Sequence, residues 1–342
     1  MKNVTEKSLF ILILLCGLLF LFLSPATAKT IQLRFSSPFP TMQVTTAKTI
    51  IPWIEEINKA GKGKVNVRLY PAGALGKTNV QYDLVEKGIA DISFHLAAYT
   101  PGRFPMTEVF SLPFMVPSAQ ITSEAMWKTF MQEPKFREEY SKVKVLALFC
   151  LPGGDVHTIK KPINHLSDLK GMKISTSNPS LNKALRIWGA VPVSMPVTEF
   201  YQSLERNVVE GAVFTWEALG IFKLDEVTKY ATIADIVTWP LMIVMNKDKW
   251  ESLPKDVKEL IDSTTGLKMS TNAGRDFDNI EVPFRARALK KGINEIILSP
   301  SELAKMKEST LPLREEWVKD MEAKGFPARK ILDTALGFLE NK

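Results

Sequence analysis

The chain has 342 residues, of which 45% are hydrophobic and 24% charged, and its formal net charge is +7. This length and apolar content favour two folded domains and argue against a disordered protein. Because the lysines and arginines are scattered along the chain and are not interleaved with aromatic residues, the positive charge does not indicate a nucleic-acid-binding face.

The N-terminus has the pattern of a secretory signal peptide. Lys2 and Lys7 precede an apolar run at 9–23, and the small residues Ala26 and Ala28 follow it. The run is shorter than the roughly 20 apolar residues that a transmembrane helix needs, so a membrane anchor is the weaker alternative. We therefore expect cleavage after Ala28, which gives a signal peptide at 1–28 and a mature chain exported to the periplasm.

Strand-like and helix-like segments alternate through the rest of the chain. Short connections between them indicate an α/β fold with open sheets, in which ligands lie beyond the carboxyl ends of strands. In chain order, we expect strands at 31–36, 65–70, 89–94, 145–149, 172–176, 208–214 and 239–246, and helices at 44–57, 79–87, 181–188, 254–268, 273–290 and 301–324.

No motif in the sequence points to catalysis, a metal or a cofactor. The histidines His95, His157 and His165 lack metal-ligand spacing, and no phosphate-binding loop or activated nucleophile is present. After signal cleavage Cys150 is the remaining cysteine, and its apolar surroundings predict a buried small side chain. We therefore expect a protein that is not an enzyme and holds no cofactor or metal.

Six segments in this order resemble one known family, the periplasmic solute-binding subunits of tripartite ATP-independent periplasmic (TRAP) transporters, or DctP family. The resemblance covers essentially the whole mature chain. The segments are VNVRLYPAGALGK (65–77), GIADISF (88–94), YTPGRFPMTEVFSLPF (99–114), HTIKKPINHLSDLKGMKI (157–174), GAVPVSMPVTEFYQSLERNVVEGAVF (189–214) and MNKDKWESLPKDVKELI (245–261).

The resemblance implies a two-lobed α/β periplasmic binding protein of type II-like class. Mixed central sheets flanked by helices would form each lobe, with a ligand cleft between the lobes and a long bent helix spanning both. Residues 29–152 and 241–280 would form lobe I, and residues 153–240 and 281–342 would form lobe II.

The resemblance also implies a function in transport. The protein would capture a small organic solute and deliver it to the membrane subunits of an ion-gradient-driven TRAP permease. The alternatives are an ABC-type binding protein, a binding protein that feeds a sensor, and a secreted enzyme. The 157–174 and 189–214 segments argue against the ABC type, and the lack of an activated group argues against the enzyme.

The chain departs from the resembled family at Ser175. Many relatives carry an arginine there that grips the ligand carboxylate with two hydrogen bonds, and Asp155 stands where sialate-type relatives carry a second arginine. A carboxylate buried against these two residues alone would be uncompensated. Either another cation replaces the arginine (Arg103, His95 or His157), or the solute is neutral or zwitterionic, or Asp155 receives an amino group.

Other candidate contacts follow from their position at strand exits. The aromatic members favour a ring-bearing or branched apolar solute, so that an aromatic organic acid is a better candidate than a plain dicarboxylate. For Phe94, Phe214 and Met242, core packing is the alternative interpretation. The predicted solute-binding set is Ser175, Asn178, Trp216, Phe214, His95, Phe39, Asp155 and Arg103.

Overall fold

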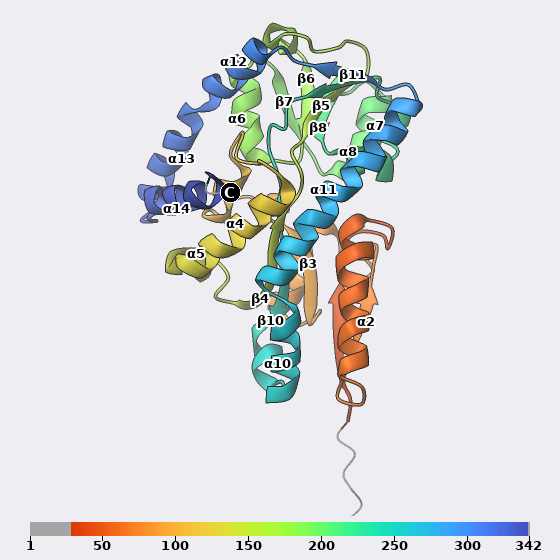
Figure 1. Ribbon diagram of the computed structural model, residues 1–342, viewed down its shortest axis with the longest axis vertical. Helices are drawn as coiled ribbons and strands as arrows, with labels where there is room; N and C mark the ends of the chain where they lie inside the picture. The colour runs from red at the N-terminus through yellow and green to blue at the C-terminus, as the bar shows by residue number, and fades with distance from the viewer. Residues whose placement is uncertain (1–28, 341–342) are drawn as a thin grey trace, which may run out of the picture.

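The computed structural model describes residues 29–340, so the predicted signal peptide and its cleavage site lie outside the described residues. Two sheets form two lobes (Figure 1). The first sheet has the order β2-β1-β3-β10-β4, in which β1, β2 and β3 are parallel and β10 runs antiparallel to both of its neighbours. Its strands are β1 (Ile31–Ser36), β2 (Val65–Tyr70), β3 (Ile92–Leu96), β4 (Val143–Cys150) and β10 (Pro240–Asn246).

The second sheet has the order β11-β9-β5-β8-β6-β7. In it β5 runs antiparallel to both of its neighbours and the other pairs are parallel, so both sheets are mixed, as predicted from the resemblance. Because β10 belongs to the first sheet, the chain crosses between the lobes after β4 and returns after β9. The strands are β5 (Asp155–Thr158), β6 (Lys173–Thr176), β7 (Val191–Ser194), β8 (Gly211–Phe214), β9 (Tyr230–Ile233) and β11 (Asn294–Ile297).

Helices cover the first sheet, and several begin where the sequence supplies a capping residue. The Ser118 hydroxyl accepts a hydrogen bond from Ile121 N at 3.1 Å and so caps α4. Pro52, which could have kinked a helix, lies in the first turn of α2, where a proline is tolerated. The helices are η1 (Thr45–Ile50), α2 (Ile51–Ala60), η2 (Thr78–Val80), α3 (Gln81–Glu86), η3 (Ala97–Tyr99), η4 (Thr107–Ser111), α4 (Ala119–Gln132) and α5 (Pro134–Glu138).

Side chains also cap the N-termini of helices in the second half of the chain. Asn178 caps α6 and Thr215 caps α8, each accepting a hydrogen bond from the backbone N–H three residues on. The helices are η5 (Leu166–Leu169), α6 (Pro179–Ile187), η6 (Val197–Glu199), α7 (Phe200–Glu205), α8 (Trp216–Ile221), η7 (Leu224–Glu226), α9 (Lys247–Ser252), α10 (Lys255–Thr264), α11 (Leu267–Lys290), α12 (Pro300–Thr310), α13 (Pro312–Glu322) and α14 (Ala328–Glu340).

The long helix α11 runs along both lobes (Figure 1). It packs against α4 on the first lobe and α8 on the second. The Asp278 carboxylate accepts hydrogen bonds from Ala119 N and Gln120 N at 2.8 and 2.9 Å, at the N-terminus of α4. One turn later, Glu281 accepts hydrogen bonds from the first two backbone N–H groups of α8, at 2.9 and 2.8 Å. A single helix therefore caps one helix of each lobe.

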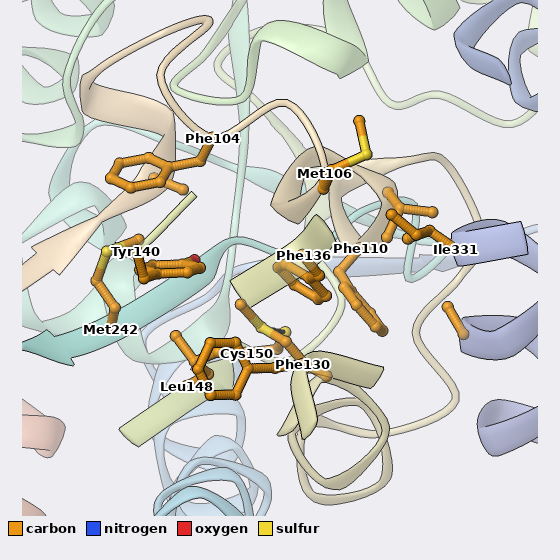
Figure 2. Packing of buried hydrophobic residues seen from close by; sticks show 14 of the residues in the cluster. Phe104, Met106, Phe110, Phe130, Phe136, Tyr140, Leu148, Cys150, Met242 and Ile331 are labelled. Carbon is orange, nitrogen blue, oxygen red and sulfur yellow. Dashed lines mark hydrogen bonds between the residues drawn. The ribbon is translucent and has the colours of Figure 1, made fainter. Parts of the chain in front are cut away.

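The last helix is placed differently from the predicted division of the chain, which assigned 281–342 to lobe II. Ile331 of α14 packs with Phe110, Phe136 and other residues of the first lobe (Figure 2). Cys150 is buried in the same cluster, as predicted. The apolar face of α14 thus returns to lobe I, because α4 and η4 offer it a matching apolar surface.

The α11–α4 contact predicts a position that tolerates no side chain. A Cβ atom added at Gly274 would lie 2.5 Å from Ala119 O, which is backbone and cannot move aside cheaply. Gly274→Ala should therefore lower the free energy of unfolding by about 1–3 kcal/mol, measured by urea denaturation.

Gly337→Ala provides the control, since it is also a helical glycine but a Cβ there has no neighbour within 4 Å. It should leave stability unchanged or raise it by up to about 1 kcal/mol. Equal stability of Gly274→Ala and the wild type would show that the two helices are not in this close contact.

Candidate functional site

A cavity lies between the two lobes. The cavity and its mouth, open to solvent, together comprise about 490 Å³. Residues of both sheets and of the crossing segments line it. They are Phe39, Gln43, Phe94, Leu96, Tyr99, Leu151, Ser177, Val197, Phe214, Thr215, Glu217, Ala218, Phe222, Trp239 and Leu241.

Aromatic rings form much of the cavity wall. Phe39 packs edge-to-face against Phe94 of β3, with ring centroids 5.8 Å apart. It makes a second edge-to-face contact, at 6.3 Å, with Phe222 of the second lobe. Such contacts stabilise aromatic pairs beyond their buried area, and the Phe39–Phe222 contact joins the lobes. The wall is therefore apolar and shared between the lobes.

Two hydrogen-bond donors at the cavity are unused. The indole N–H of Trp239 and the O–H of Tyr99 are buried and donate to no described residue, although the Val197 backbone N–H interacts with the Tyr99 hydroxyl oxygen. A buried donor without a partner costs about 1–3 kcal/mol, so native proteins rarely leave one unpaired without a functional reason. Both residues line the cavity, which makes these two donors candidates for contact with a bound molecule.

One acidic side chain lines the cavity, and no basic side chain does so among the described residues. Glu217 is 3% exposed, and its carboxyl accepts a long hydrogen bond from Val44 N, at 3.4 Å. Burial raises the pKa of Glu217 to about 7. Since Val44 lies in the first lobe and Glu217 in the second, this bond also spans the cleft.

The structure brings Phe39 and Phe214 of the predicted set to the cavity. Ser175 does not line it: the hydroxyl donates a hydrogen bond to Val193 O at 3.1 Å and so ties β6 to β7. Asn178 also lies outside the lining, because its side chain caps α6 and donates to Thr238 O at 2.9 Å. Ser177, between these two predicted residues, reaches the cavity instead.

Asp155 and Trp216 form a buried pair beside the cavity. The Trp216 indole N–H donates to Asp155 Oδ2 at 3.0 Å, and backbone N–H groups of Ala234 and Asp235 donate to Oδ1. Burial, followed by the charge of Asp235, raises the pKa of Asp155 to about 7. With its acceptor positions used in this way, Asp155 supports the wall and lies outside the cavity lining.

His157 stacks on Phe214, with ring centroids 4.0 Å apart, and does not line the cavity. Burial lowers the pKa of His157 to about 3, so the ring is neutral at physiological pH. His95 bonds Thr100 Oγ1 through Nε2 at 3.1 Å, and burial lowers its pKa to about 3 as well. Neither histidine supplies a cation to the cavity.

Arg103 is also engaged elsewhere. Its guanidinium forms ion pairs with Asp83 and Glu86 and lies 4.2 Å from the ring centroid of Tyr82. The charge expected to replace the missing arginine is thus already neutralised by two carboxylates on α3. Among residues 29–340, no cluster of three or more His, Cys, Asp or Glu side chains could hold a metal ion.

Sequence reasoning missed Tyr99, Trp239, Glu217 and Phe222. A signal existed for one of them, because Glu217 is the single charged residue in the apolar stretch FTWEALGIF (214–222). Trp239 precedes a strand, where a large apolar residue most often packs in the core. Tyr99 lies in a short 3₁₀ turn that no periodicity marks.

The placement of Arg103 predicts a structural role for this residue. Arg103→Met should lower the free energy of unfolding by about 1 kcal/mol, because two partly exposed ion pairs and the contact with Tyr82 are lost. The Kd for any organic acid that stabilises the wild type should change less than about threefold. A large loss of affinity at an unchanged Tm would instead make Arg103 a ligand contact.

Residues 39–320 match the family described as bacterial extracellular solute-binding protein, family 7 (DctP). A marine metagenome TRAP solute-binding protein, specific for aromatic acid ligands and solved with metahydroxyphenylacetate, is 36% identical. That match covers 91% of this chain and 100% of that chain, with a TM-score of 0.87. A TRAP solute-binding protein from Rhodoferax ferrireducens, solved with copurified benzoate, is 30% identical to this chain. The match covers 91% of this chain and 98% of that chain, with a TM-score of 0.86.

A third solved relative, a TRAP solute-binding protein from Bordetella bronchiseptica with bound mandelate, is 27% identical. The match covers 91% of this chain and 99% of that chain, with a TM-score of 0.84. No helix within residues 29–340 has the length and hydropathy needed to cross a bilayer. The family resemblance, the two-lobed fold and the transport function predicted from sequence are confirmed. The chain belongs to family 7 of the bacterial extracellular solute-binding proteins and is the non-enzymatic, extracytoplasmic subunit that captures a small organic solute for a TRAP permease.

Proposed function

We propose that the interlobe cavity binds an aromatic monocarboxylic acid. The observation that carries this proposal is a wall of aromatic rings without a basic side chain among the described lining residues. Two relatives of at least 30% identity were solved with aromatic acids, which agrees with this chemistry. The solute ring would lie against Phe39, Phe94 and Phe222, where edge-to-face contacts are favourable.

The solute carboxylate would accept hydrogen bonds from Trp239 Nε1–H and the Tyr99 O–H, which donate to no described residue. Hydrogen bonds to a charged group contribute about 1.5–3 kcal/mol each, so two of them stabilise one buried carboxylate. A second carboxylate would find no basic side chain among the described lining residues and would be buried at a large cost. The cavity should therefore select an aromatic monoacid over a C4 dicarboxylate.

Closure of the lobes would be coupled to binding. The Phe39–Phe222 contact and the Val44–Glu217 hydrogen bond both link the lobes at the cavity edge. A solute that touches both walls adds contacts that exist in the closed form alone, and this difference shifts the population toward closure.

Export and the roles of the individual residues around the cavity are proposed as well. Export would follow from a signal peptide at 1–28 cleaved after Ala28. Phe39 and Phe214 are proposed as contacts of the solute, since both line the cavity. The other predicted residues are proposed to support its walls: Ser175, Asn178, Trp216, His95, Asp155 and Arg103.

A thermal-shift comparison tests this selectivity. Benzoate, 3-hydroxybenzoate and mandelate should each raise the Tm of the mature protein, and succinate should not. A ligand at a hundredfold excess over its Kd adds about 2.7 kcal/mol to the free energy of unfolding, which is easily measured.

A matched pair of variants locates the site. Trp239→Phe should weaken benzoate binding about tenfold or more, because one charge-assisted hydrogen bond is lost. Trp317→Phe is the control, since its indole N–H is also buried and unpartnered but lies in the first-lobe core. A succinate shift as large as that of benzoate, or equal effects of the two variants, would contradict the proposed function.

A further inference from the structure

We propose that Glu217 holds the solute carboxylate as a proton donor, so that each aromatic acid binds together with one proton. This inference rests on the proposed function and adds a specific role for the one acidic residue of the cavity. It also accounts for how a carboxylate can be held in a cavity that has no basic side chain among its described lining residues.

The geometry of Glu217 suits a neutral carboxyl better than an ionised one. The side chain is buried at the start of α8 and faces the same cavity as the aromatic wall. Its one hydrogen bond from a described residue is that from Val44 N, at 3.4 Å. A buried carboxylate normally needs several good donors or a cation, so this environment favours the protonated form.

The charged groups around α8 also favour the protonated form of Glu217. Glu281 holds its carboxyl against the backbone N–H of Glu217 at 2.8 Å, and burial together with Glu217 and Asp155 raises the pKa of Glu281 to about 8. Arg285 pairs with Glu295, and Lys48 is exposed. Helix α11 and the η7 turn pack against α8. The charged groups on these two elements are Lys268, Arg275, Asp276, Asp278, Glu281, Arg285, Arg287 and Lys290 on α11 and Asp225 and Glu226 on η7. Other titratable groups near the cavity are Lys48, Tyr99, Asp155, His157 and Lys223.

A solute carboxylate next to an ionised Glu217 would be repelled, because two anions would share one apolar cavity. Next to a protonated Glu217, the same carboxylate would accept an O–H···O⁻ hydrogen bond, which is among the strongest that proteins form. The complex therefore retains the proton more tightly than the free protein. When Glu217 is ionised beforehand, the missing proton comes from solvent.

The sign of the pH dependence follows. Below about pH 7 the buried Glu217 already carries its proton, and affinity should be independent of pH. Above this value a proton must be taken up on binding, and affinity should fall by up to about tenfold for each pH unit. An exposed carboxyl with an ordinary pKa would be ionised throughout this pH range, so binding beside it would show neither this pH dependence of affinity nor proton uptake.

Isothermal titration of the mature protein with benzoate, in two buffers of different ionisation enthalpy, measures the protons exchanged. We expect almost no proton uptake at about pH 6, and uptake approaching one proton per benzoate at about pH 8.5, with the accompanying loss of affinity. Glu217→Gln keeps a donor at every pH, so its affinity should be independent of pH and its proton uptake should vanish.

Glu108→Gln is the matched control. Glu108 also accepts a single 3.4 Å hydrogen bond from a backbone N–H, that of Gly102, and burial raises its pKa, but it lies outside the cavity lining. This variant should retain the wild-type pH dependence. Circular dichroism and Tm measurements check that each variant is folded.

The outcomes separate the two proposals. Benzoate binding of equal affinity at both pH values, without proton uptake, would overturn the inference and leave the proposed function standing. Tighter binding of 3-hydroxybenzoate at high pH would also overturn it, because Glu217 would then act as an ionised acceptor for the phenol. If neither aromatic acid binds at any pH, both proposals fail.

Discussion

The architecture depends on two carboxyl side chains that α11 presents one helical turn apart. Asp278 binds the free backbone N–H groups at the start of α4 in the first lobe, and Glu281 binds those at the start of α8 in the second. Each removes a cost that an unsatisfied helix end would otherwise carry. Because Asp278 and Glu281 belong to the same helix, α11 connects the two lobes and fixes the position of α8. In this position Glu217 faces the first lobe.

The chemistry of the cavity depends on the basic side chains predicted to reach it, which are either paired with carboxylates or uncharged. Arg103 is paired with Asp83 and Glu86, and burial keeps His95 and His157 neutral. The cavity therefore keeps an apolar wall, and a bound anion depends on neutral donors. Neutral donors hold one carboxylate well and a second one poorly, which is how an uncharged wall can discriminate between monoacids and diacids.

Much of the fold could be predicted from the sequence, because β1, β2 and β10 carry clear apolar patterns and the resemblance covers the mature chain. The four-residue strand β7 (VPVS) was not predicted, because so short a segment shows no clear period, whereas β6 and β8, equally short, fall within the predicted strands at 172–176 and 208–214. Phe39 could be found from its place after a strand, whereas Ser175 at a similar place bonds Val193 O. Trp239 was missed because a residue lines an interlobe cavity through tertiary contacts that local sequence does not encode.

The most direct measurement is a crystal structure of the mature protein with benzoate. The account predicts benzoate between the lobes, with its ring against Phe39 and Phe222 and its carboxylate within hydrogen-bond distance of Trp239 Nε1 and the Glu217 carboxyl. No lysine or arginine nitrogen should lie within about 4 Å of the carboxylate, the distance that defines an ion pair. Benzoate bound elsewhere, or bound here but paired with a lysine or arginine, would contradict the account.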